Sequence, residues 1–323
     1  MNKPYFVHIC QFLILFLGVS SIAVAQTWPN RQIKFVVPFA AGGANDLMAR
    51  SAAEGASKQL NQNIIIENRP GAGGSIGSAY VAQTIPDGYT FLISAAGVIS
   101  NPMIKKNSLY KETDLTPVVM IALSPSVVVV SAKSEWKDLK DLIEASKLGP
   151  GFHFATAGTG STPHFVAELL NTKYGAKFIP VPYKSGSESA TAVMGGQVIG
   201  TSEASIVALP NIKTGGKFKA LATTWTKRIS AFPELSTAVE QGFPELQIAH
   251  WAGIHAPTGV PSVILDKLAG AVDAAMKDNL TADKLKAVGI EPVGGTRQAF
   301  NEFIKAEKSR LGFIVKSAGM KED

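Results

Sequence analysis

The sequence predicts an α/β protein of two domains, in which helices cover a parallel sheet. The chain has 323 residues, and at about 150 residues per domain this length suggests two hydrophobic cores. Its composition, 46% hydrophobic and 17% charged, is that of a folded globular chain. Short β-branched and aromatic segments alternate with helix-like segments, and this alternation favours a parallel sheet with helical crossovers.

The predicted elements follow from apolar periodicity and from bounding Gly, Pro and Asn residues. In the first third of the chain, strands are expected at 33–37, 63–67 and 90–94, with helices at 45–60 and 75–83. The same alternation returns with strands at 126–130, 152–155 and 177–181 and a helix at 163–174. The last segments are predicted as a strand at 248–256 and helices at 262–277, 282–288 and 298–318.

Two apolar segments are predicted to connect the domains. Residues 117–130 carry the chain into the second domain, and a return is expected near Trp251. The first domain is then discontinuous, with residues 26–124 and 252–323, and residues 125–251 form the second domain. A connection of two strands is a natural hinge, because few contacts resist rotation about it.

Residues 1–25 are predicted to be a secretory signal peptide. Lys3 gives a positive start, residues 12–19 form a short apolar core, and Ala-Val-Ala at 23–25 is a cleavage site. The core is too short to span a bilayer, and an uncleaved N-terminal anchor is the alternative. Cys10 is the only cysteine and lies in this segment, so no disulfide or multi-cysteine metal site is expected in the exported, soluble chain.

Charge and motif content exclude several function classes. The net charge is +6, but the 31 basic residues are spread along the chain, so no nucleic-acid partner is expected. The chain has no P-loop, no Gly-x-Ser-x-Gly and no His-Glu-x-x-His motif, and we expect no cofactor, metal or catalytic group. His250 and His255 are interpreted as separate packing side chains. An exported α/β hydrolase using Ser161 and His164 remains the enzymatic alternative.

Residues 38–46, Pro-Phe-Ala-Ala-Gly-Gly-Ala-Asn-Asp, form a strand-to-helix junction that is predicted to bind an anion. Glycines there leave backbone N–H groups unshielded at the positive end of the helix dipole, where a carboxylate or phosphate is stabilised. Asp46 is interpreted as a cap or first-turn residue of the helix rather than an acid–base group.

Residues 155–164, Ala-Thr-Ala-Gly-Thr-Gly-Ser-Thr-Pro-His, repeat this design in the second half of the chain. Pro163 is expected in the first helical turn, with Ser161 or Thr162 as the cap and His164 as a possible ligand neighbour. The glycine-dense segment 68–77 fits either a tight crossover or a ligand contact, and both readings stay open.

Eight segments that span nearly the whole chain after residue 25 carry a family resemblance. They are 31–50, 66–77, 86–92, 157–164, 181–186, 194–198, 209–213 and 251–257. The string Glu-Asn-Arg-Pro-Gly-Ala-Gly-Gly at 67–74 is the most specific of them. In these segments the chain resembles the Bug-type (TctC-like) receptors of tripartite tricarboxylate transporters.

The resemblance implies a periplasmic receptor of the Venus-flytrap type, with two α/β lobes and a two-strand hinge. Such a receptor is no enzyme. It captures a small carboxylate, a di- or tricarboxylate or an aromatic acid, and delivers it to separately encoded membrane permease subunits. We expect a monomer. A sensor that feeds a membrane kinase is the alternative role.

The resemblance also implies the ligand contacts. In the first lobe they are Phe39, Ala41, Gly42, Gly43 and Asp46, with Ser94 and Ala95 in the strand end 94–97. In the second lobe they are Ala157, Gly158, Thr159, Gly160, Ser161 and His164, followed by Tyr183, Lys184, Ser185 and Gly186. Glu203 is a further candidate contact, on its sequence position rather than on the resemblance.

One position departs from the family pattern Gly-x-Val-Asp. Here Ile199 replaces the usual acid, and Ser202 replaces the aromatic residue expected three positions later. Loss of an acid near a ligand ammonium group disfavours amino acids, although Glu203 offers another acid nearby. We therefore expect an aromatic or aliphatic carboxylate or dicarboxylate.

Overall fold

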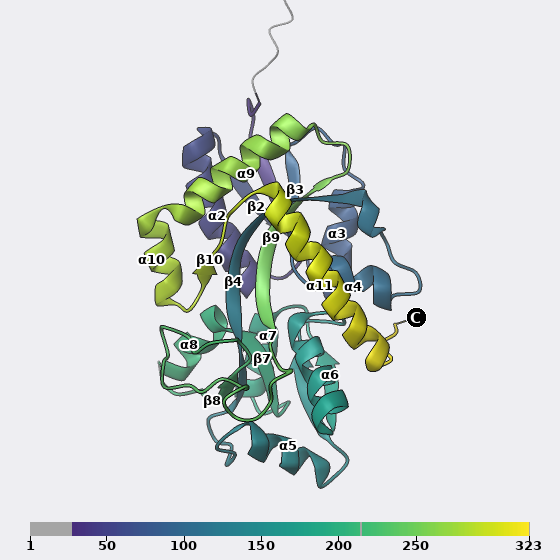
Figure 1. Cartoon of the computed structure of the whole chain (residues 1–323), viewed down its shortest axis with the longest axis vertical. Coiled ribbons are helices and arrows are strands. Elements are labelled where there is room, and N and C mark those ends of the chain that lie inside the picture. Colours follow the sequence, from purple (N-terminus) through teal and green to yellow (C-terminus); the bar gives the residue numbers. More distant parts are fainter. Residues whose placement is uncertain (1–27, 214, 323) are drawn as a thin grey trace, which may run out of the picture.

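Two long antiparallel strands, β4 (Leu115–Ser131) and β9 (Ala249–Pro257), run through the centre of the molecule (Figure 1). The computed structural model describes residues 28–213 and 215–322. Residues 115–125 of β4 pair with β9, and residues 126–131 pair with β7 and β8. Strand β4 thereby joins two half-sheets, in the overall order β2-β1-β3-β9-β4-β7-β5-β6.

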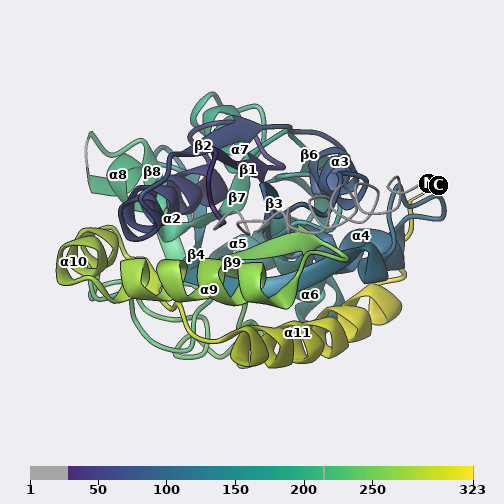
Figure 2. The same cartoon turned by 90° about the horizontal axis from the view of Figure 1, so that it is seen from above.

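The N-terminal half-sheet contains β2 (Ile64–Asn68), β1 (Ile33–Val37), β3 (Thr90–Ser94), β9, the first part of β4 and β10 (Glu291–Pro292). Alternate side chains of β1 enter two different cores. Ile33, Phe35 and Val37 pack with helices α2 (Ala44–Leu60) and α9 (Ser262–Lys277), whereas Val36 belongs to the core under α4 (Gly97–Ile104) and α11 (Arg297–Ser317). Figure 2 shows α9 and α11 along one side of the molecule.

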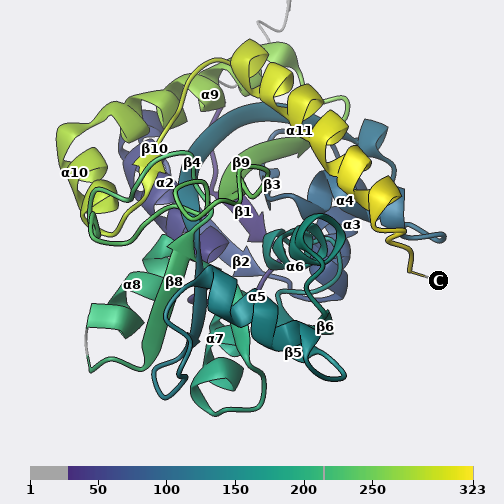
Figure 3. The same cartoon turned by 60° about the horizontal axis from the view of Figure 1, so that its bottom comes forward.

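The second half-sheet comes from the middle of the sequence. It contains the rest of β4 with β7 (Gly200–Ala204), β5 (Phe152–Thr156), β6 (Phe178–Pro182) and β8 (Phe218–Thr223). Its helices, brought forward in Figure 3, are α5 (Leu139–Lys147), α6 (Thr162–Tyr174), α7 (Gly186–Met194) and α8 (Ser205–Lys213). Val128 and Val130 face the core under α5 and α6, and Val127 and Val129 face α7 and α8. This strand is buried on both faces, as its β-branched sequence predicts.

Most predicted elements occur within one or two residues of their expected bounds, and the strands at 33–37 and 90–94 match them. The remaining helices are α3 (Ser75–Ala82) and α10 (Asn279–Ala287). The sheet is mixed rather than parallel, because β4 and β9 run antiparallel to their neighbours. The predicted signal peptide lies outside the described residues. Within residues 28–213 and 215–322, no helix has both the length and the apolar character that a membrane span requires.

Candidate ligand-binding site

A cavity of about 40 Å³ lies between the two half-sheets, which is space for a few water molecules. Its wall is built mainly from the junctions at which strands lead into helices. The lining residues are Phe39, Gly43, Ala44, Asn45, Ala95, Ala96, Gly97, Ala157, Ser161, Thr162, Pro163, Gly186, Glu203 and His250. Both half-sheets contribute, so the cavity forms only when they face each other at this separation.

Four helices, α2, α4, α6 and α7, begin at the wall of this cavity. The N-cap residues of α2, α4 and α6 make no side-chain cap hydrogen bond, although in α4 the N–H groups of Val98 and Ile99 donate to the carbonyls of Ala95 and Ala96. Each helix also directs the positive end of its dipole toward the cavity. Among the described residues, no lysine or arginine lines the wall. The site is therefore suited to an anion held by backbone N–H groups.

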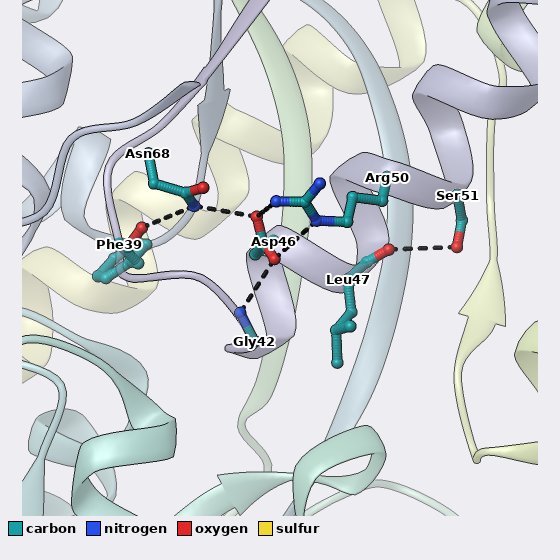
Figure 4. A network of polar contacts seen from close by, with 7 residues as sticks. All are labelled: Phe39, Gly42, Asp46, Leu47, Arg50, Ser51 and Asn68. Carbon is teal, nitrogen blue, oxygen red and sulfur yellow. Dashed lines mark hydrogen bonds and ion pairs between the residues drawn. The ribbon is translucent and has the colours of Figure 1, made fainter. Parts of the chain in front are cut away.

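Asp46 shapes the first loop from behind the cavity wall (Figure 4). It lies in the first turn of α2, as predicted, and is only 2% exposed. Its carboxylate accepts hydrogen bonds from Gly42 N (3.0 Å), Asn68 Nδ2 (2.9 Å) and Arg50 Nε (2.9 Å). Burial alone would raise the pKa of Asp46, but the hydrogen bonds from Arg50, Gly42 and Asn68 outweigh it and lower this pKa. Asp46 is thus an ionised support for the loop.

The second loop is held by its own hydroxyl and imidazole groups. Ser161 occupies the N-cap position and Pro163 the first turn of α6, as predicted. Ser161 Oγ donates to Gly158 O (2.6 Å), and His164 Nδ1 accepts from Gly160 N (3.0 Å). Because each side chain is bonded to the loop backbone, Ser161 and His164 do not form the hydrogen-bonded pair that a hydrolase would require.

Glu203 and His250 are the two titratable residues in the wall. Glu203 on β7 is 2% exposed, and its Oε1 lies 3.2 Å from Thr201 Oγ1. Burial raises the pKa of Glu203 to about 8. His250 on β9 places Nε2 3.1 Å from Ser126 Oγ, and burial lowers the pKa of His250 to about 4. At neutral pH, neither side chain brings a full charge into the cavity.

The structure divides the predicted contacts into two groups. Those in the cavity wall are Phe39, Gly43, Ala95, Ala157, Ser161, Gly186 and Glu203. Those outside it are Ala41, Gly42, Asp46, Ser94, Gly158, Thr159, Gly160, His164, Tyr183, Lys184 and Ser185. Ser94 Oγ faces the core, where it lies 2.7 Å from Nδ1 of the buried His255. His255 is a packing side chain, as expected, whereas His250 also lines the cavity.

Some wall residues are missing from the expected ligand contacts, although several of them lie in the predicted glycine loops. Asn45, Thr162 and Pro163 are neighbours of predicted contacts, and the position of each helix start would have identified them. No sequence pattern around His250 marks it as a wall residue, because β9 brings it to the cavity from far along the chain.

The two half-sheets touch beside the cavity. Ser100 Oγ on α4 donates to Gly160 O (2.8 Å) in the loop before α6. Gly73 lies against the backbone of Thr159, and a Cβ at Gly73 would overlap the Thr159 carbonyl oxygen. The glycine-dense segment 68–77 is thus a contact between the half-sheets at the rim of the cavity.

Comparisons with known proteins agree on one family. The family described as "Tripartite tricarboxylate transporter family receptor" matches residues 48–320. The chain is 32% identical to protein BugT of Bordetella pertussis over 328 residues, which cover 99% of each chain.

Solved structures give the same result. The chain is similar to periplasmic binding protein BugD, with a TM-score of 0.86, 30% identity and coverage of 92% of this chain and 100% of BugD. It is also similar to Rpa4515 of R. palustris, solved with adipate, with a TM-score of 0.87, 33% identity and coverage of 91% and 99%. MatC of Rhodopseudomonas palustris, solved with malate, matches with a TM-score of 0.83, 29% identity and coverage of 89% and 100%. These findings confirm the predicted periplasmic-binding-protein fold, and the chain belongs to the TctC/Bug family of tripartite tricarboxylate transporter receptors.

Proposed function

We propose that this protein is a periplasmic receptor that captures a small carboxylate and delivers it to separately encoded membrane permease subunits. The observation that carries this proposal is the convergence of four helix N-termini on one cavity whose wall has no lysine or arginine among the described residues. The adipate and malate complexes of its relatives support the same ligand class. We expect a di- or tricarboxylate or an aromatic acid.

Capture follows from the division of the donors between two lobes. We propose residues 26–124 and 252–323 as one lobe and residues 125–251 as the other. Helices α2 and α4 then belong to the first lobe and α6 and α7 to the second. A bridging carboxylate contacts both pairs of N–H donors only in the closed state, so binding shifts the population toward closure. Strands β4 and β9 serve as the hinge, and the closed surface is what the permease recognises.

The role requires binding without chemical change. The hydrogen bonds of Ser161 and His164 hold the loop rather than activate a nucleophile, which supports a receptor that is no enzyme. We further propose export by the signal peptide with cleavage after Ala25, and a monomeric mature chain without cofactor or metal.

Thermal unfolding of the mature chain against carboxylates, amino acids and phosphates tests this function. A ligand at about 100 times its dissociation constant stabilises the fold by about 2.7 kcal/mol, so we expect a clear rise in midpoint with at least one carboxylate. Ala157→Leu places a larger side chain at the cavity wall and should abolish that rise. The matched control Ala274→Leu, on the exposed face of α9, should keep it. A wild-type midpoint that no carboxylate moves would contradict the proposal.

A further inference from the structure

We propose that Glu203 is protonated when the carboxylate ligand is bound, so that ligand capture is linked to the uptake of a proton. This inference rests on the proposed function, because it takes the ligand to be an anion. It assigns Glu203 the role of a neutral hydrogen-bonding group in the wall rather than that of a fixed negative charge.

The two acceptors around the Thr201 hydroxyl group favour a proton on Glu203. Thr201 Oγ1 lies 3.0 Å from Ala155 O and 3.2 Å from Glu203 Oε1. A carbonyl oxygen only accepts, and a hydroxyl group has one proton to donate. When Thr201 donates to Ala155 O, its contact with Glu203 is a hydrogen bond only if the carboxyl group supplies the proton. Both bonds are therefore satisfied at once by a neutral Glu203.

The surroundings of Glu203 offer no compensating cation. Oε2 lies close to Gly186 at the start of α7, where a Cβ would overlap it. Strand β4 places Val127 opposite Glu203 and has no charged residue between Leu115 and Ser131. Among the described residues, the other titratable group in the cavity wall is His250, and its lowered pKa keeps it neutral at neutral pH.

Titratable side chains on the other helices and strands that pack near Glu203 lie outside the cavity wall. On α6, His164 lies near Glu168, and on α7, Glu188 accepts from Lys184 N (3.1 Å). His153 on β5 is exposed. On α2, Asp46 is paired with Arg50. None of them lines the cavity or neutralises Glu203.

A bound anion strengthens the preference for the neutral acid. Before binding, the four helix N-termini favour a negative charge in the cavity. Once the ligand occupies those donors, a second negative charge at Glu203 would face the ligand at close range in a buried site. Two negative charges at this range repel each other. Binding of the anion therefore raises the pKa of Glu203 further. The neutral acid then directs its proton to Thr201 or to a ligand oxygen.

The experiment is to measure the dissociation constant of the ligand between pH 6 and pH 9.5, using succinate and adipate as probes. We expect a constant value up to about pH 7.5 and a weakening that approaches tenfold per pH unit above about pH 8. Glu203→Gln has a neutral side chain of the same shape that cannot titrate, so its affinity should stay constant from pH 6 to pH 9.5 and should exceed that of wild type above about pH 8. The control Glu188→Gln, on the exposed first turn of α7, should keep the wild-type pH profile.

Calorimetry at pH 8.5, in two buffers with different protonation enthalpies, provides an independent readout. Wild type should take up at most about three quarters of a proton per ligand, since that fraction of Glu203 is ionised at pH 8.5 before binding, and Glu203→Gln should take up none. The proposal is overturned if wild-type affinity is flat or rises over this range, or if Glu203→Gln, folded by its thermal midpoint, loses binding. The latter result would identify Glu203 as an anion that pairs with a cationic ligand group. Failure of wild type to bind any carboxylate at any pH would instead contradict the proposed function.

Discussion

Each half of the molecule has a buried acid near the cavity, Asp46 behind the wall and Glu203 within it, and the two acids differ in charge state. Asp46 and Glu203 are both 2% exposed. Asp46 accepts hydrogen bonds from Gly42, Asn68 and Arg50, and its pKa is lowered. Glu203 has a hydroxyl neighbour, Thr201, and its pKa is raised to about 8. Equal burial thus leads to different chemistry, because the number and charge of the partners decide which form is stable.

The largest expected effect is at Glu203. The folded chain keeps this proton up to about pH 8, whereas an unfolded glutamate loses it near 4.5, so wild-type stability falls as pH rises between these values. Glu203→Gln removes the fall and should stabilise the fold by about 3–5 kcal/mol at pH 8, with little change at pH 4. Urea unfolding at both pH values measures the difference. Equal stability of the two proteins at pH 8 would show that Glu203 does not hold a shifted proton.

The opposite change is expected at Asp46. Asp46→Ala leaves Gly42 N without its acceptor and Asn68 Nδ2 with Phe39 O alone, and it should cost about 2–3 kcal/mol at neutral pH, since Arg50 is half exposed and adds little. Because the folded pKa of Asp46 is lowered, this cost should shrink as pH falls below the ordinary value of 3.8. Urea unfolding at pH 7 and pH 3 tests both statements. As a control, Glu54→Ala in the exposed pair with Lys58 should change stability by less than about 0.5 kcal/mol.

A third prediction concerns the contact that brings the two walls together. In Gly73→Ala the new methyl group would overlap the Thr159 carbonyl oxygen, and φ at this position is 61°. Full closure should become unfavourable, and the affinity for a carboxylate should fall tenfold or more. Calorimetric titration measures the loss, and small-angle scattering should show the ligand-bound variant to be more extended than ligand-bound wild type. Gly270→Ala, with open space around the new Cβ, is the matched control. Unchanged affinity would mean that this contact is not needed for capture.

The smallest expected effect is at Ser100, which donates to Gly160 O across the two halves. Ser100→Ala removes one neutral hydrogen bond, about 0.5–1.5 kcal/mol, and should weaken ligand binding about two- to tenfold. Ser94→Ala, which removes a buried hydroxyl that bonds within the N-terminal half, should alter stability but not affinity. If Ser94→Ala weakens binding as much as Ser100→Ala, the effect is not specific to closure.

Many local elements of this fold are predictable from the sequence, but helices α4, α5, α7 and α8 and strands β7 and β8 are not among those predicted, and neither is the assembled wall. Residues 33–37 and 90–94 are dense in β-branched and aromatic side chains, and both are strands. Strand β7 escapes prediction because its sequence, Gly-Thr-Ser-Glu-Ala, is polar although every residue in it is buried. Its burial depends on hydrogen bonds to neighbouring strands that no local pattern reveals.

The candidate ligand-binding site shows the same difference between local features, which the sequence predicts, and their assembly, which it does not. The glycine loops identify where α2 and α6 begin, because glycine next to a helix start has a local physical meaning. Whether a side chain in such a loop faces the cavity or supports it from behind depends on the opposite half of the molecule. Asp46 and Ser161 illustrate both outcomes, since Asp46 lies behind the wall and Ser161 within it. The lobe boundaries and the ligand contacts stay predictions.

A wall in which residues 28–213 and 215–322 place no lysine or arginine also determines how ligand binding responds to salt. Mobile ions screen the attraction between separated charges over about 10 Å at 0.1 M salt, but they have little effect on donors that touch the ligand inside a closed cavity. A site made of backbone N–H groups should therefore bind its carboxylate almost equally well in dilute and in saline surroundings. Under the proposed function, capture of the ligand would then stay steady while the ionic strength outside the cell changes.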